Sequence, residues 1–114
     1  DIVRYYTKAA FLCHAAAYEG FPLAVTEALA AGLPVVGFQE CSGLNRLVED
    51  GRNGLLVPEG EDLVASILPP LRRMISDADL RATLSKEAPV SMLPYLPEVV
   101  MDKWEAFVSG RLEA

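Results

Sequence analysis

Residues 18–36, YEGFPLAVTEALAAGLPVV, join a turn-rich loop, a helical pattern and an apolar run in that order. Good helix formers fill the middle of the stretch, Pro22 suits the first turn of a helix, and Gly32 suits its C-terminal end. A short apolar run lies on each side, over Ala9–His14 and over Pro34–Phe38. Such bounded runs are typical of fully buried parallel strands. The stretch therefore predicts a strand, helix and strand unit.

The same alternation continues downstream. Ser42 can cap a short helix over residues 43–50, and turn signals then precede a third apolar run, Gly54–Val57. Repeated alternation of strands and helices predicts an α/β fold with a parallel sheet. Because most sheets have five or six strands, we expect earlier strands upstream of Asp1. The expected fold is a Rossmann-like parallel half-sheet.

Helices follow the sheet. The pattern predicts a helix over Glu61–Ser76, with a break or sharp kink at Pro69-Pro70 because proline removes a helical N–H. A second helix is predicted over Asp77–Lys86, with Asp77 as its cap, followed by an irregular stretch around Pro89, Pro94 and Pro97. A last helix is predicted over Glu98–Ser109. The half-sheet therefore carries a helical C-terminal extension.

The bulk composition is that of part of a larger folded protein. The chain has 114 residues, 52% of them hydrophobic, and opens on Asp1 without methionine or a signal sequence. Its mean hydropathy of +0.24 is high for so small a folded unit. Residues 1–114 are therefore expected to form one partial domain of a larger protein.

The net charge, the apolar runs and the cysteines exclude several classes of partner and site for this chain. Sixteen acidic against ten basic residues give a net charge of −6, which argues against a nucleic-acid partner. No apolar run approaches the roughly 20 residues of a transmembrane helix. Cys13 and Cys41 are too few for a disulfide scaffold or a zinc site, and are read as small buried residues in a reducing compartment. The expected location is the cytoplasm, including the inner face of the membrane.

The candidate site lies where the first strand gives way to the helix. Ligands of open α/β sheets bind at the carboxyl ends of strands, and a helix start presents free N–H groups and a positive dipole end to anions. Glu19 could accept hydrogen bonds from sugar hydroxyls, Glu27 could bind a vicinal diol, and Gly20 lets a ligand approach the backbone. The predicted binding residues are Glu19, Gly20, Phe21, Pro22, Leu23, Ala24 and Glu27.

Three segments together resemble a known family. EGFPLAVTEALAAGLPVV is similar to the Glu-seven-residues-Glu motif of the family 4 group of retaining glycosyltransferases, which have the GT-B fold. SGLNRLVEDGRNGLLVPEG and YLPEVVMDKWEAFV resemble later segments of the same family, so the similarity covers nearly the whole chain. Two features depart from the usual family pattern. Ala15–Ala17 replace a frequent serine, and Cys41-Ser42-Gly43 replaces a Gly-Gly turn, as in a branch that builds bacterial surface polysaccharides.

The resemblance implies that residues 1–114 are part of a nucleotide-sugar-binding domain, with an acceptor domain elsewhere in the protein. It also implies a role for each residue of the site. Glu19 would contact the donor sugar as the catalytic residue, Glu27 would hold the ribose hydroxyls, and the amides of Gly20–Ala24 would meet the sugar and the diphosphate. The enzyme would transfer a sugar with retention of configuration and without a metal ion. The nucleotide sugar would be its substrate, so no cofactor is expected. An arginine and a lysine on earlier strands would stabilise the leaving diphosphate, so we expect this chain alone to be inactive.

The same residues also have simpler interpretations. Glu27 suits the start of any helix, because the helix dipole favours a carboxylate there. His14 is interpreted as a hydrogen-bonded core residue rather than a catalytic base. Tyr5, Tyr6 and Phe11 are interpreted as core or interface residues.

Uncovered surfaces predict self-association. The last helix presents Val99, Met101 and Trp104, and the strand Ala9–His14 would lack a neighbour on one side. An open strand edge and an apolar helix face both favour association. The alternative function is accordingly a noncatalytic scaffold or oligomerisation module derived from a glycosyltransferase domain.

Overall fold

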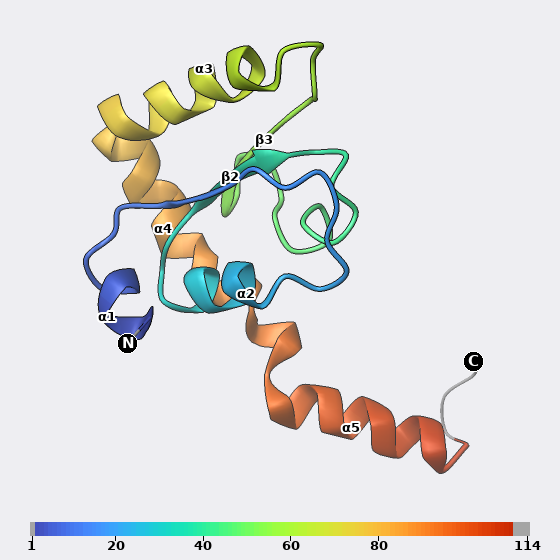
Figure 1. Ribbon diagram of the computed structural model, residues 1–114. Coiled ribbons are helices and arrows are strands. Elements are labelled where there is room, and N and C mark those ends of the chain that lie inside the picture. The colour runs from blue at the N-terminus through green and yellow to red at the C-terminus, as the bar shows by residue number, and fades with distance from the viewer. Residues whose placement is uncertain (1, 111–114) are drawn as a thin grey trace.

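A computed structural model describes residues 2–110 and contains a three-stranded parallel sheet (Figure 1). The strands are β1 (Leu12–His14), β2 (Val35–Phe38) and β3 (Gly54–Val57), in the order β1-β2-β3. The middle strand pairs in parallel with both neighbours. The predicted α/β class, the parallel pairing and all three strand positions are therefore confirmed.

The first strand lies at the edge of the sheet, as expected, but it is not fully buried as we predicted. Cys13 is exposed, whereas Cys41 is buried. Cys13 pairs with Val36, whose side chain belongs to the part of the core beneath α3 (Leu63–Ser76). That helix packs mainly on β2 and β3, so its cover does not extend over Cys13.

Helix α2 (Leu23–Ala30) connects the first two strands and buries one face against the sheet. Ala31 caps its C-terminal end, and Gly32 follows with φ of +88°, the left-handed conformation that stops a helix. The predicted end at or just before Gly32 is confirmed. At the other end, Pro22 is the N-cap residue and not a first-turn residue. Its missing N–H is still one that the helix could not have used.

Residues 42–50 do not form the short helix expected after Ser42 but a series of turns with buried apolar side chains. The carboxamide of Asn53 takes the place of two backbone partners that Leu47 and Glu49 would have in a helix. It accepts a hydrogen bond from the Glu49 N–H and donates one to the Leu47 carbonyl. The apolar spacing of this segment reflects burial within turns, so the helix prediction was wrong.

Helix α3 passes through Pro69 and Pro70 as one helix, so the predicted interruption was wrong. The N–H groups that the two prolines lack would have bonded the carbonyls of Ala65 and Ser66. Ala65 is exposed and Ser66 half-buried, so water can hydrate the freed carbonyls. The buried side of α3, which includes Pro70, packs on β2 and β3 and holds the helix together.

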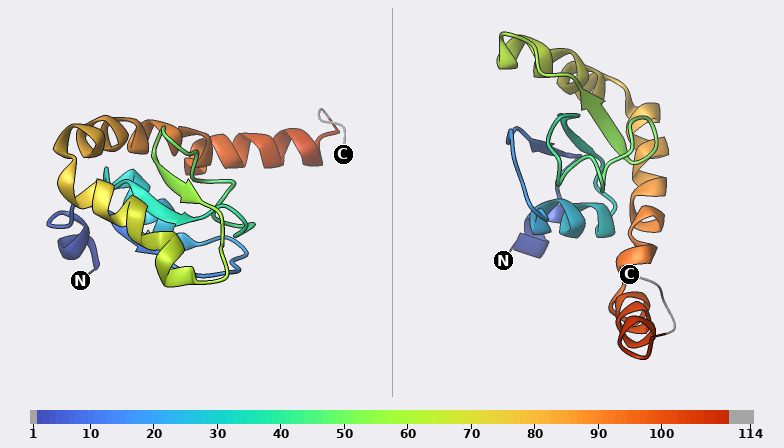
Figure 2. Two further views of the ribbon diagram at one scale, coloured as in Figure 1. Left: turned by 90° about the horizontal axis from the view of Figure 1, so that it is seen from above. Right: turned by 90° about the vertical axis from the view of Figure 1, so that its right-hand side faces the viewer.

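Helix α4 (Ala78–Ser91) starts after Asp77, whose carboxylate accepts a 2.9 Å hydrogen bond from a first-turn N–H, as predicted. It continues beyond its predicted end and includes Pro89, where we expected irregular structure. Ala88 is fully buried in the core, and this packing maintains the last turn. A short 3-10 helix, η1 (Leu93–Tyr95), follows. In Figures 1 and 2, α4 runs along one side of the sheet and contacts both α2 and α3.

The two terminal helices differ in burial. In α1 (Ile2–Tyr6), Tyr5 is 71% exposed and so is not a core residue, which leaves its interpretation as an interface residue, whereas Tyr6 is buried in the core. Helix α5 (Pro97–Val108) has no buried residue and extends away from the sheet (Figure 2). Its apolar face is exposed, as expected, and Trp104 is 60% exposed. Within residues 2–110, no helix is long and apolar enough to cross a membrane.

Candidate functional site

The predicted binding residues lie beyond the carboxyl end of β1, in the loop that leads into α2 and in the first two turns of that helix. The side chains of Phe21 and Leu23 are exposed, and Pro22 is buried beneath them. Gly20 is also exposed, and a Cβ there would meet nothing within 4 Å. The backbone of this loop is therefore open to a ligand.

The start of α2 provides backbone donors for an anion. The N–H groups of Val25 and Thr26 both donate to the Pro22 carbonyl. Within residues 2–110, the preceding N–H groups of Phe21, Leu23 and Ala24 have no backbone partner. Free amides at the positive end of a helix dipole stabilise a phosphate.

Glu19 lies beside a histidine that our sequence analysis did not assign to the site. The His14 Nε2 is 3.5 Å from the Glu19 Oε1. The His14 Nδ1 is buried without a hydrogen-bond partner in the described part of the chain. A buried N–H without a partner is costly, which favours a proton on Nε2, near the carboxylate, over one on Nδ1. His14 is therefore a neighbour of the site and not only a core residue; its place at the strand end was the one signal in the sequence.

Glu27 also has a partner that the sequence did not reveal. The Tyr6 hydroxyl donates a 3.2 Å hydrogen bond to the Glu27 Oε2. Burial, followed by this hydrogen bond and the negative charge of Glu27, raises the pKa of Tyr6 above its ordinary value of 10.0. The tyrosine therefore stays protonated as a donor at neutral pH. Only the fold brings the end of α1 to the second turn of α2.

Gly43 packs against the loop between β1 and α2, residues 15–22, which contains Glu19 and is called the acidic loop below. A Cβ at this position would lie 2.4 Å from the Glu19 carbonyl oxygen and 2.7 Å from that of Gly20. Real side chains do not approach backbone atoms so closely, so only glycine fits. The turns that follow β2 therefore pack directly against the loop that follows β1.

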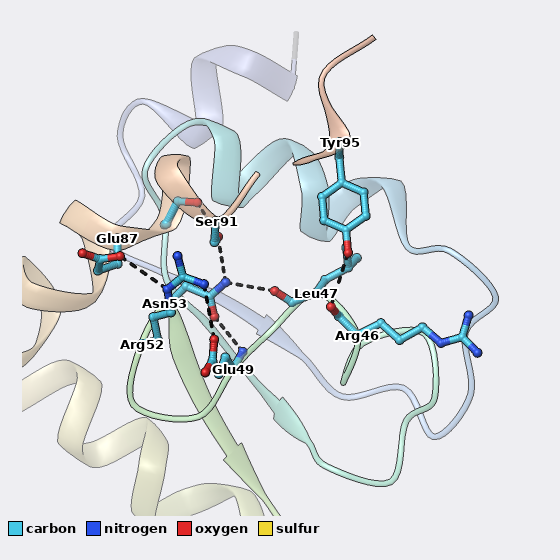
Figure 3. Close-up of polar contacts among 9 residues, drawn as sticks. Arg46, Leu47, Glu49, Arg52, Asn53, Glu87, Ser91 and Tyr95 are labelled. Carbon is cyan, nitrogen blue, oxygen red and sulfur yellow. Dashed lines mark hydrogen bonds and ion pairs between the residues drawn. The ribbon is translucent and has the colours of Figure 1, made fainter. Parts of the chain in front are cut away.

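A buried asparagine holds those turns in place (Figure 3). Asn53 is 1% exposed, and its side chain makes three hydrogen bonds. Two of them reach Leu47 and Glu49 in the turns, and the third reaches the Ser91 hydroxyl at the end of α4. The side chain thereby ties the turns to α4. A cavity of about 350 Å³ adjoins it, with Arg46 and Tyr95 in its lining.

The C-terminal extension also reaches the acidic loop. The rings of Phe21 and Tyr95 lie 6.0 Å apart in a tilted arrangement, within the range of aromatic contacts. The Tyr95 hydroxyl donates to the Arg46 carbonyl at 3.5 Å (Figure 3). Gly43 and Tyr95, from two distant parts of the sequence, thus contact the predicted loop, and Tyr6 contacts the helix that follows it. Among the described residues, no group of three or more potential metal ligands comes together.

Known proteins resemble this chain along most of its length. The profile of the family described as glycosyl transferases, group 1, matches residues 1–90. An uncharacterized glycosyltransferase of Haemophilus influenzae is 29% identical over 108 residues, which is 95% of this chain and 30% of that protein. An amylovoran biosynthesis glycosyltransferase of Erwinia amylovora is 46% identical over 63 residues, which is 54% of this chain and 15% of that protein.

A solved structure shares the fold. The crystal structure of HepE from Anabaena, in complex with UDP and glucose, superposes with a TM-score of 0.77 at 25% sequence identity. The superposition covers 96% of this chain and 29% of that protein. The chain therefore spans less than a third of the length of each of these three relatives.

Proposed function

Because the chain belongs to the group 1 glycosyl transferases, we propose that the protein containing it transfers a sugar from a nucleotide-sugar donor to an acceptor with retention of configuration. The bond from the anomeric carbon to the diphosphate breaks, and an acceptor hydroxyl oxygen takes the place of the diphosphate on the same face of the sugar. The proton of that hydroxyl passes to the leaving diphosphate. The observation that carries the proposal is the open amide cluster at the start of α2, flanked by Glu19 and Glu27.

The residues take the following roles. The free amides of Phe21, Leu23 and Ala24 bind the diphosphate, and Gly20 lets it approach the backbone. Pro22 is buried and fixes the start of α2. The helix dipole stabilises the charge that develops on the leaving diphosphate, so the reaction proceeds without a metal ion.

The two carboxylates bind the ends of the donor. Glu19 accepts hydrogen bonds from the donor sugar, and His14 orients its carboxylate. Glu27 accepts hydrogen bonds from the ribose hydroxyls. The nucleotide is proposed to be uridine diphosphate, because the similar HepE structure contains UDP and glucose. Polysaccharide biosynthesis is the proposed setting, by analogy with the amylovoran relative, and the cytoplasm remains the expected location.

This chain supplies only part of the proposed site. The loop and the first turns of α2, residues 15–27, contain no arginine or lysine to neutralise the diphosphate. Activity is therefore proposed to need basic side chains and an acceptor-binding domain from the rest of the protein.

The test measures turnover of a UDP-sugar by the whole protein after Glu19→Gln and, separately, Glu27→Ala. Each change removes charge-assisted hydrogen bonds worth about 1 to 3 kcal/mol, so kcat/KM is expected to fall about 5- to 150-fold. Neither change removes buried apolar area, so Glu19→Gln should leave the melting temperature unchanged. Glu27→Ala also removes the acceptor of the Tyr6 hydroxyl, so it should cost no more stability than one hydrogen bond, about 1 kcal/mol. Glu61→Gln, at an exposed position just before α3, is the matched control and should keep full activity.

Three outcomes would contradict parts of the proposal. Full turnover in both glutamate variants would refute the site, and inversion at the anomeric carbon, read by nuclear magnetic resonance of the product, would refute retention. Loss of activity with a metal chelator would refute the metal-independent reaction. A noncatalytic scaffold predicts no turnover of any nucleotide sugar in the same assay.

A further inference from the structure

We propose that Tyr6 is a positioning residue that holds the Glu27 carboxylate in place for the ribose diol of the donor. The inference rests on the proposed function, in which Glu27 binds that diol. It concerns a residue of α1, outside the predicted site, and is drawn from the contact between α1 and α2.

The geometry favours one donor and one acceptor. The Tyr6 hydroxyl is 3.2 Å from the Glu27 Oε2 and 3.5 Å from the Ala24 carbonyl oxygen. A phenol has a single proton to donate, and the nearer, negatively charged oxygen is the better acceptor. The hydroxyl therefore bonds the carboxylate.

The bond leaves part of the carboxylate free for a ligand. Within residues 2–110, the Glu27 Oε1 has no hydrogen-bond partner, and the residue is exposed. An exposed glutamate samples many rotamers and loses that freedom when it binds. Tyr6 restricts the carboxylate in advance, so the donor has less conformational entropy to remove.

Tyr6 itself is not placed to contact the donor. Its side chain is only 8% exposed and packs in the core cluster beneath α2. Its hydroxyl is already directed at Glu27 and at the backbone of α2. It therefore acts through Glu27, which makes it a positioning residue and not a catalytic one.

The experiment compares Tyr6→Phe with Tyr5→Phe in the whole protein. Both changes remove one phenolic hydroxyl from neighbouring residues of α1, but Tyr5 is 71% exposed. Calorimetry measures the affinities for UDP and for 2′,3′-dideoxyuridine diphosphate, which lacks the diol. Kinetics measures kcat and the KM for the UDP-sugar, and thermal melting checks the fold.

Tyr6→Phe is expected to weaken UDP binding and raise the donor KM about three- to tenfold, the effect of losing one hydrogen bond. The affinity for the dideoxy compound should stay the same, because that ligand makes no use of Glu27. The kcat at saturating donor should also be retained. Tyr5→Phe should match the wild type in every measurement, and Tyr6→Phe should have no further effect in a Glu27→Ala background.

The outcomes distinguish a failure of the inference about Tyr6 from a failure of the proposed role of Glu27. If the wild type prefers UDP over the dideoxy compound and Tyr6→Phe keeps the full preference, the inference about Tyr6 is wrong and the assignment of Glu27 stands. If the wild type shows no preference, the assignment of Glu27 fails and the inference fails with it. Should Tyr6→Phe unfold at the assay temperature, Tyr6→Met fills the same apolar space without a donor and takes its place.

Discussion

Replacing Asn53 with alanine should destabilise the chain by about 3 kcal/mol. The side chain makes hydrogen bonds of 2.8 Å with the Glu49 N–H, 2.9 Å with the Leu47 carbonyl and 2.8 Å with the Ser91 hydroxyl. A buried hydrogen bond contributes about 1 kcal/mol net, so losing all three gives that value. Glu49 is exposed and Ser91 keeps a bond to the Ala88 carbonyl, so water and existing partners limit any further loss.

Urea unfolding of the chain, followed by circular dichroism, tests this value. With a slope of about 1.5 kcal/mol per M, typical of small proteins, the midpoint should fall by about 2 M. The matched control is Asn45→Ala in the same segment. Asn45 is exposed and its side chain donates one hydrogen bond, to the Gln39 carbonyl. Its removal should cost less than about 1 kcal/mol.

Two results would refute the reasoning about Asn53. If Asn53→Ala and Asn45→Ala shifted the midpoint equally, the buried carboxamide would not hold the turns. Asn53→Asp should be no more stable than the alanine variant, because its carboxylate cannot donate to the Leu47 carbonyl and its charge is costly at a buried position. An aspartate variant as stable as the wild type would show that the acceptor side alone suffices.

Two further outcomes are expected. Gly43→Ala should displace the acidic loop through its contact with the carbonyl oxygens of Glu19 and Gly20, and so lower both the melting temperature and the affinity for UDP. Gly20→Ala, the control, should leave the melting temperature unchanged. If the wild type and both variants melted at the same temperature, Gly43 would not support the loop. The exposed face of α5 should promote self-association of the chain, so sedimentation at rising concentration should show dimers or larger species that Trp104→Ser reduces, and a strictly monomeric wild type would count against it.

The positions of the strands could be predicted because their signal is local. The run Gly54–Val57 is bounded by turn residues, and its predicted and observed limits agree. Gly32 ends α2 through its own φ angle, which no other part of the chain has to supply. Asp77 likewise caps α4 with its own carboxylate. Where one residue and its immediate neighbours set the conformation, the sequence was a sufficient guide.

The helices with proline show where local rules failed. Pro69 and Pro89 each lack a helical N–H, yet both lie inside helices. Burial of the adjoining apolar face outweighs the lost hydrogen bonds, and that burial depends on what the helix packs against. The prediction for residues 42–50 was wrong in the opposite sense, because a helix was predicted and turns formed. Asn53 supplies hydrogen bonds to the Glu49 N–H and the Leu47 carbonyl that a helix would otherwise have made internally.

In the candidate site, too, some features could be predicted from the sequence and others depend on tertiary contacts. The sequence by itself determined the loop, the start of α2 and the two carboxylates, because a parallel strand followed by a helix places them at the carboxyl edge of the sheet. Only the tertiary structure decided what holds those carboxylates, since Tyr6 lies 21 residues from Glu27, and α2 and β2 separate Gly43 in the sequence from the loop against which it packs. Such contacts arise from the packing of distant segments, and no spacing within the sequence encodes them.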